Sequence, residues 1–335
     1  MMKRAAIVVM VAALAACSSN PNEHKPAPLP VLPQKAMQLK LHKQWSVNVG
    51  DGLAGDVIKL HAATQANLTY VASRDGVVLA IDEQGKTVWQ QKTKLPITSG
   101  VAAGYGVVVI ATAKGEVLAL NPANGQTLWR KTLLAPVLAS AALSAETIVI
   151  QSNDGKVYGL DSKTGEKRWV YDTPVPSLSL RGYATPLIDE NLVIVATATG
   201  KIVALDVNTG IAQWESRIAT SEGRSELARM VDVDGDMLMT INKELYVASY
   251  QGQLAALNIK DKPDPLWTLP TSTTQSLAEG LGNVYVVDAA SSIISVDQET
   301  GKVVWKQSDF AWRGLSNPVV VGNYLVVGDS RSEEH

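Results

Sequence analysis

Residues 199–214 read TGKIVALDVNTGIAQW, and they carry the clearest structural pattern in the chain. Its first half combines small and branched apolar residues, which favours a short β-strand. Asp206 can accept hydrogen bonds from backbone N–H groups two residues on, and Gly210 can adopt the positive φ that closes a tight hairpin. Trp214 then falls on the returning strand. The stretch therefore predicts a β-hairpin whose second strand carries a tryptophan.

The same pattern recurs along the chain. Clear copies occupy residues 75–89, 114–129 and 154–169, and two looser copies end at Trp267 and Trp305. Seven of the eight tryptophans fall on one register, with spacings of 44, 40, 40, 45, 53 and 38 residues. The seven are Trp45, Trp89, Trp129, Trp169, Trp214, Trp267 and Trp305. A period of about 40–45 residues is typical of the blades of a β-propeller.

Each repeat supplies enough strands for one blade. Another β-rich run lies upstream of each hairpin, such as GVVVIA at 106–111. With an inner strand before that run, a repeat holds about four strands. A lone four-stranded sheet cannot bury both faces, but blades stacked around an axis bury each other. We therefore expect an all-β propeller in which the seven tryptophans pack one blade against the next.

The repeat count predicts an eight-blade design that lacks its C-terminal end. Six full repeats end at the tryptophans from Trp89 to Trp305, and a seventh runs through residues 317–329. Trp45 is expected on an outer strand that completes a blade with three strands from the C-terminus. On this interpretation the rest of the seventh blade and most of the eighth, roughly 55 residues at this period, are expected to be missing. We assign the propeller to residues 44–329 and a non-repeat tail to 330–335.

The N-terminus has the pattern of an export signal followed by a tether. Two basic residues precede an apolar run, and Leu14-Ala15-Ala16 precede Cys17. This box resembles that of bacterial lipoproteins, which implies a signal peptide at 1–16 and a lipid on Cys17. Ser18, in place of aspartate, implies the periplasmic face of the outer membrane. The Pro-rich stretch 17–43 is expected to be an extended, lipid-anchored tether. The alternative is an ordinary secreted protein with a free thiol.

Composition argues against several functional classes. The 30 Lys+Arg against 32 Asp+Glu give a net charge of −2, without the basic excess of a nucleic-acid binder. No window of about 18 apolar residues appears, so the membrane is expected to be contacted through the lipid alone. The histidines lack metal-ligand spacing, and no Gly-x-Ser-x-Gly elbow occurs. We expect no metal, no cofactor and no catalytic residue. The four histidines are His24, His42, His61 and His335.

Two weaker motifs fit structure better than chemistry. GDGLAG at 50–55 matches a dinucleotide-binding pattern, but residues 57–60 are expected to continue as a strand instead of the helix that a pyrophosphate needs. Asp75, at the spacing of the ribose-binding carboxylate, already belongs to a repeat turn. The stretch DVDGD at 232–236 suggests calcium, but an EF-hand loop needs its glycine at position six. A turn between strands is favoured in both cases.

Two irregular connections are candidate partner-binding segments. Residues 170–185 and 215–237 each join a tryptophan-bearing strand to the next blade, so they should emerge side by side on one face. If the first is extended, Leu178 and Leu180 project to the same side, next to Arg181. Clustered anchors of this kind carry most of the energy of an interface. The alternative is that these leucines are tucked under the loop. Asp232 and Asp234 have the same spacing on the second segment, where solvated carboxylates are the ordinary alternative.

The chain as a whole resembles the BamB family of lipoproteins of the outer-membrane β-barrel assembly (BAM) machinery. The resemblance rests on the lipoprotein box, the Pro-rich tether, the Ala-Leu-Asp-x-x-Thr-Gly-x-x-x-Trp repeats and, most specifically, PSLSLRG at 176–182. It implies a non-enzymatic scaffold that docks on the POTRA domains of BamA and aids insertion of β-barrel proteins. Unfolded outer-membrane proteins are a further implied partner. The implied BamA contacts are Leu178, Leu180, Arg181, Asp232 and Asp234.

Two other interpretations compete with this one. The repeats also resemble those of PQQ-dependent quinoprotein dehydrogenases. Those enzymes usually carry adjacent paired cysteines over the quinone and a calcium-binding acidic cluster, and this chain has one cysteine. A generic peptide- or polysaccharide-binding propeller is the third interpretation. Trp312, near Phe310 and outside the register, has no predicted role.

Overall fold

The computed structural model describes residues 24–30, 42–55, 58–180, 184–220, 222, 224–259 and 262–329, with the side chains of residues 262 and 263 left aside. Cys17, Arg181 and the tail at 330–335 therefore lie outside the described residues. The described part contains six four-stranded antiparallel sheets and one two-stranded sheet. It contains no helix long and apolar enough to cross a membrane.

Each sheet is one blade, and its strands follow one another in chain order. The first three blades are β1 (Ala63–Gln65), β2 (Leu68–Ala72), β3 (Val77–Asp82) and β4 (Thr87–Lys92); β5 (Ala102–Gly104), β6 (Val107–Ala111), β7 (Glu116–Leu120) and β8 (Thr127–Thr132); and β9 (Ala142–Leu143), β10 (Thr147–Gln151), β11 (Lys156–Asp161) and β12 (Lys167–Asp172).

The next three blades repeat this order. They are β13 (Leu187–Asp189), β14 (Leu192–Ala196), β15 (Lys201–Asp206) and β16 (Ala212–Arg217); β17 (Leu238–Met239), β18 (Glu244–Ala248), β19 (Gly252–Asn258) and β20 (Lys262–Thr271); and β21 (Ala278–Gly280), β22 (Asn283–Val287), β23 (Ile293–Asp297) and β24 (Val303–Gln307). The hairpin β25 (Val319–Val321) and β26 (Tyr324–Val326) follows, and the 3-10 turn η2 (Leu227–Arg229) precedes the fifth blade.

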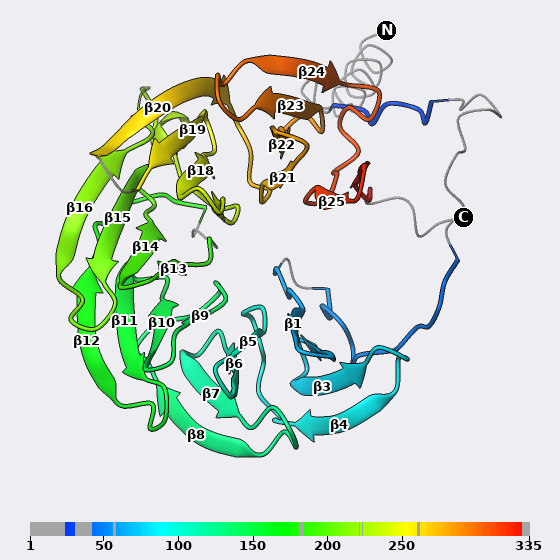
Figure 1. The fold of residues 1–335 in the computed structure, drawn as a ribbon, viewed down its shortest axis with the longest axis vertical. Helices are drawn as coiled ribbons and strands as arrows, with labels where there is room; N and C mark the ends of the chain where they lie inside the picture. Colours follow the sequence, from blue (N-terminus) through cyan, green and yellow to red (C-terminus); the bar gives the residue numbers. More distant parts are fainter. Residues whose placement is uncertain are drawn as a thin grey trace, which may run out of the picture.

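The blades are arranged around a common centre. The first strand of each blade faces the centre, and the tryptophan-bearing fourth strand lies on the rim (Figure 1). The predicted β-propeller of four-stranded blades is confirmed by this arrangement. The total of eight blades stays a prediction, since the described residues hold six blades and one hairpin.

The core consists of apolar layers between neighbouring blades. One layer joins Val109 and Ala119 of the second blade to Ile148 and Leu160 of the third, and similar layers follow around the ring. The middle strands are buried on both faces, so they are predominantly apolar and do not alternate. Burial of this apolar area between blades is the main favourable contribution to the fold.

The tryptophans pack against the blade that follows their own. Trp169 Nε1 donates a hydrogen bond of 2.9 Å to the Val207 carbonyl, and its ring covers Gly210. A Cβ on Gly210, whose φ is +70°, would lie 2.6 Å from the indole. Four other tryptophans bond to the next repeat turn and cover its glycine in the same way. They are Trp45, Trp89, Trp129 and Trp267, over Gly85, Gly125, Gly165 and Gly301, with indole N–H bonds of 3.0, 2.7, 3.0 and 2.8 Å.

Within its own blade, each rim tryptophan faces a small residue on the third strand. Trp169 pairs with Gly159, Trp214 with Ala204, and the ladder shifts by one residue directly after each pair. The other pairs are Trp89 with Ala80, Trp129 with Ala119, Trp267 with Ala256 and Trp305 with Ser295. A small residue opposite each indole leaves room for the ring between blades. Trp214 is half-buried in the layer with the fifth blade, and Trp305 is exposed.

Three expectations need correction. Trp45 does not lie on a strand: residues 42–49 pair with no strand in the described part, although Val47 and Val49 pack on the first blade. Residues 58–60 are also irregular where a strand was expected, because the first blade begins only at Ala63. Residues 24–30 of the predicted tether contact the chain near Trp312 instead of standing apart from the propeller.

Candidate functional site

The candidate site lies where two connections between blades meet. The first connection leaves β12 and enters the fourth blade, and the second leaves β16 and enters the fifth. The Leu180 backbone N–H donates a hydrogen bond to Asp232 Oδ2, and the Thr185 N–H donates one of 2.7 Å to Asp236 Oδ1. The two connections therefore lie side by side, as their positions in the repeat predicted. We call residues 173–186 and 218–237 together the docking face.

Asp232 and Asp234 are buried, with exposed fractions of 0% and 6%. The alternative of solvated carboxylates was wrong, because both are used inside the protein. Asp232 accepts the Leu180 N–H through its side chain, and its own carbonyl accepts the Tyr250 N–H at 2.8 Å. Buried carboxylates need such partners, since a carboxylate without them is costly to remove from water. Asp232, which belongs to the second connection, therefore helps to fix the conformation of the first.

Asp234 is bound by a lysine from the other end of the chain. Lys59 Nζ lies 2.9 Å from Asp234 Oδ2 and also donates to the Asp234 carbonyl at 3.2 Å and the Thr274 carbonyl at 2.8 Å. The ammonium group thus ties the segment before the first blade to the connections before the fifth and sixth blades. Sequence reasoning missed Lys59 because no local motif links residues 175 positions apart.

The two leucines are not equivalent. Leu178 has 42% of its surface exposed, while Leu180 is half-buried, as expected for a residue whose amide is fixed by Asp232. A shallow pocket beside Leu178 is lined by Val175, Pro176 and Pro136 together with polar groups such as Asn153. Leu178 is therefore an accessible apolar anchor of the docking face, together with Val175 and Leu227, which are 47% and 60% exposed.

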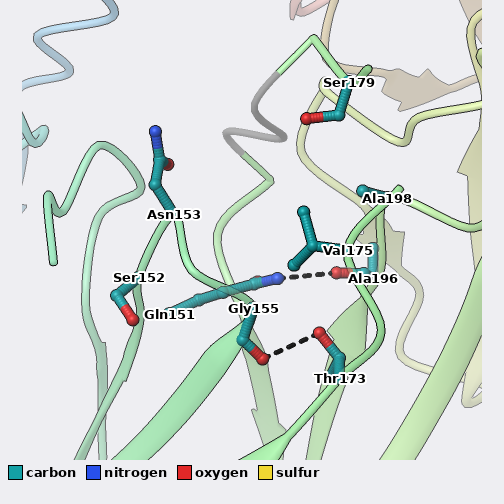
Figure 2. Close-up of a pocket in the computed structure, with 9 residues that line it drawn as sticks. All are labelled: Gln151, Ser152, Asn153, Gly155, Thr173, Val175, Ser179, Ala196 and Ala198. Carbon is teal, nitrogen blue, oxygen red and sulfur yellow. Dashed lines mark hydrogen bonds between the residues drawn. The ribbon is translucent and has the colours of Figure 1, made fainter. Parts of the chain in front are cut away.

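A second pocket adjoins the first, between the third and fourth blades (Figure 2). Two hydrogen bonds cross it: Gln151 Nε2 donates to the Ala196 carbonyl at 2.9 Å, and Thr173 Oγ1 donates to the Gly155 carbonyl at 2.8 Å. Its lining has no acid, base or charged side chain. The lining residues are Gln151, Ser152, Asn153, Gly155, Thr173, Val175, Ser179, Ala196 and Ala198. Such a lining offers hydrogen-bonding groups for contact and no acid–base pair for chemistry.

Metal-binding groups do not gather in the part of the chain that the structure describes. No cluster of three or more His, Cys, Asp or Glu side chains with suitable geometry occurs there. The dinucleotide-like stretch 50–55 forms turns, and Asp75 Oδ1 accepts the Asp51 N–H at 3.1 Å. The hydroxyl of Ser73 and the Asp51 amide lower the pKa of Asp75 by hydrogen bonding to its carboxylate. Asp75 thus stabilises a turn.

The fold and its repeats define this protein as a tryptophan-docked β-propeller in which two inter-blade connections lie side by side. A family model described as outer membrane protein assembly factor BamB matches residues 74–307 and 277–333. The chain belongs to the BamB family.

Individual relatives agree with this assignment. The outer membrane protein assembly factor BamB of Pseudomonas aeruginosa is 46% identical over 335 residues, covering 99% of this chain and 87% of the relative. Its counterpart in Escherichia coli is 32% identical, covering 98% and 86%. The crystal structure of BamB from Moraxella catarrhalis matches with a TM-score of 0.76 and 33% identity, covering 81% and 82%.

A quinoprotein enzyme shares the fold only. The quinohemoprotein alcohol dehydrogenase ADHIIG of Pseudomonas putida matches with a TM-score of 0.54 at 16% identity, covering 66% of this chain and 43% of that one. An identity this low extends to the architecture and not to the chemistry. The resemblance of the repeats to quinoprotein repeats therefore reflects a common blade design.

Proposed function

We propose that this protein is a non-enzymatic scaffold of the outer-membrane β-barrel assembly complex, which assists insertion of β-barrel proteins into the outer membrane. Membership of the BamB family carries this proposal, since several relatives bear the name outer membrane protein assembly factor. The docking face supports it, because this face offers an exposed apolar anchor and its adjoining pocket has no ionisable lining.

The proposed partner of the docking face is the POTRA region of BamA. In this proposal Leu178 and Leu180 supply apolar contact and Arg181 supplies a cation. Asp232 and Asp234 act by holding the first connection and by linking the second to Lys59. A preorganised surface loses less conformational entropy on binding than a mobile loop does. The arrangement thus favours a stable complex without any change in the propeller. Unfolded outer-membrane proteins are a further proposed partner.

The proposed location is the periplasmic face of the outer membrane, with Cys17 carrying the lipid after removal of residues 1–16. This part of the proposal is supported by the sequence of the lipoprotein box. Contact with the bilayer would then come through acyl chains, each buried CH₂ of which contributes about 0.8 kcal/mol.

The test is recovery of BamA with the tagged protein from solubilised outer membrane. Leu178→Ala is expected to lower recovery several-fold, because it removes an exposed anchor, while the urea midpoint of the variant stays that of the parent. Ile241→Ala is the matched control: this side chain is almost fully exposed, but it lies in the turn between β17 and β18, away from the docking face. Equal recovery with Leu178→Ala and the parent would exclude the proposed contact, and quinone-dependent dye reduction by the purified protein would overturn the non-enzymatic role.

A further inference from the structure

Trp312, which the repeat does not explain, lies in the connection that leaves β24. Its φ is +61°, an unusual value for a residue with a side chain, and 39% of its surface is exposed. The loop is fixed on both sides of the residue: the Trp312 N–H donates to the Ala290 carbonyl at 2.9 Å, and the Gly314 N–H donates to Ser291 Oγ at 3.1 Å. The backbone that carries the indole is therefore held in place by its neighbours.

The N-terminal segment His24–Pro30 contacts this loop at three points. The His24 ring stacks on the Trp312 indole, with ring centroids 3.7 Å apart and planes inclined by 5°. The Ala27 N–H donates to the Ala311 carbonyl at 2.8 Å, and Arg313 Nη1 donates to the Ala27 carbonyl at 3.0 Å. Side-chain stacking is thus combined with recognition of both backbone groups of Ala27. Figure 1 shows the segment in dark blue beside the end of β24.

Arg313 makes the contact a built site. Only 8% of its surface is exposed, and its guanidinium forms an ion pair with the similarly buried Asp329. The ion pair orients the guanidinium, so its Nη1 is directed at the Ala27 carbonyl without further ordering. A buried ion pair needs hydrogen-bond partners for its remaining N–H groups, and the Ala27 carbonyl is such a partner for Nη1.

The sequence of the segment suits such a site. Pro26, Pro28 and Pro30 alternate along it, and each proline fixes its own φ and restricts the residue before it. The segment therefore loses little conformational entropy when it binds, which is why Pro-rich segments are common ligands of aromatic surfaces. Both partners belong to one chain, so binding is intramolecular and does not depend on protein concentration.

We propose that Ala311, Trp312 and Arg313 form a docking site for the chain's own segment His24–Pro30, and that this docked strap fixes where the N-terminal end of the chain leaves the propeller. The point at which this segment leaves the propeller lies on the same side of the ring as the docking face. The connection after β24 contacts the turn between β22 and β23, as the connection after β12 contacts the turn between β10 and β11 through Thr173 and Gly155. The N-terminal end and the docking face therefore share one side of the propeller.

The test measures whether the strap holds one position in the isolated protein. Spin labels are placed at Leu29→Cys, on the strap, and Ile241→Cys, on an exposed turn, in the full chain in detergent with Cys17→Ser as background. A docked strap gives a single narrow distance. An undocked segment of fifteen residues between Leu29 and Trp45 would spread on the order of 20 Å.

Two variants separate docking from folding. His24→Ala and Trp312→Ala are each expected to broaden the distance distribution, while the far-ultraviolet circular dichroism of the propeller stays unchanged. Because His24 lies outside the blades, its substitution cannot unfold them. Tyr105→Ala, which removes an exposed aromatic between β5 and β6, is the matched control and is expected to keep the distance narrow. A broad distribution in the parent, or one that neither variant changes, would overturn the proposal. No BamA is present, so the outcome does not depend on the proposed function.

Discussion

The backbone N–H of Leu180 donates its hydrogen bond to the carboxylate of Asp232, so the fifth blade's entry segment holds the fourth blade's entry segment in shape. The Thr185 N–H and Asp236 Oδ1 repeat the same relationship at 2.7 Å a few residues further on. The carboxylates of Asp232 and Asp236, on the second connection, thus hold two backbone amides of the first connection. The docking face is a property of two blades together, and neither connection would be expected to keep its form alone.

Asp232→Ala is expected to loosen the first connection. Without the carboxylate, the Leu180 amide loses its acceptor, and the loss of such a bond to a charged group costs about 1–3 kcal/mol. Hydrogen exchange of the Leu180 amide should become faster, and the change should be largest in residues 173–186. Asp264→Ala, which removes an exposed carboxylate of β20, serves as the control and should leave that exchange rate unaltered. An unchanged Leu180 amide in Asp232→Ala would contradict the assigned role.

Gly210→Ala is expected to cost more than Gly106→Ala, although both glycines have positive φ. The φ values are +70° and +78°, so backbone strain is similar, about 1–2 kcal/mol. At Gly210 the new Cβ also meets the Trp169 ring, whereas nothing lies within 4 Å of a Cβ at Gly106. The additional overpacking is worth about 1–3 kcal/mol by urea unfolding.

A double-mutant cycle combines Gly210→Ala with Trp169→Ala. Removal of the indole should cost about 3–5 kcal/mol on its own, but it also removes the clash. The loss of stability in the double variant should therefore be smaller than the sum of the losses in the two single variants. Simple additivity would mean that the ring and the glycine do not interact in solution.

Asp206 is expected to make stability depend on pH in the acid range. Hydrogen bonds of 2.8 Å from the Thr209 hydroxyl and from its amide lower the pKa of Asp206 below the ordinary value of 3.8. The folded state then binds fewer protons than the unfolded chain, so this contribution is present above about pH 4 and is lost as pH falls through the lowered pKa. Because the carboxylate is near solvent, the effect is modest.

The urea midpoint of Asp206→Asn should lie below that of the parent at pH 7, and the gap should close towards pH 3. The second blade contains a natural comparison, since Asn121 occupies the equivalent place and accepts the Ala123 N–H at 2.8 Å without titrating. Asp264→Asn is the control in an exposed position and should show no gap at either pH. A gap that widens with acid would refute the assigned sign.

The sequence was sufficient for the blade design, because every determinant of a blade is local. Asp206, Gly210 and Trp214 lie within nine residues, and the same spacing recurs in the repeats that end at Trp129, Trp169 and Trp305. Strand order within each sheet follows chain order, so no long-range pairing had to be predicted. The adjacency of the two candidate connections followed from the same period.

The burial of the candidate site could not be predicted in this way. Whether Asp232 is solvated depends on the path of another connection, and the ion pair of Asp234 depends on Lys59, which is distant in sequence. The contact of His24 with Trp312 joins opposite ends of the chain for the same reason. Residue type and spacing identify candidates for a site. Which partner each side chain contacts, however, is set by tertiary packing.

The docked strap also limits the length of free chain between the proposed lipid anchor and the propeller. With the lipid anchor proposed at Cys17, an unbound linker would be free up to Trp45, a stretch of chain that can extend to about 95 Å. Docking at His24 leaves only the stretch from Cys17 to His24, which can extend to about 25 Å. With the strap undocked, the propeller would sample a deep layer of the periplasm. With the strap docked, it stays beside the bilayer, with its connections close to the surface on which barrels are inserted.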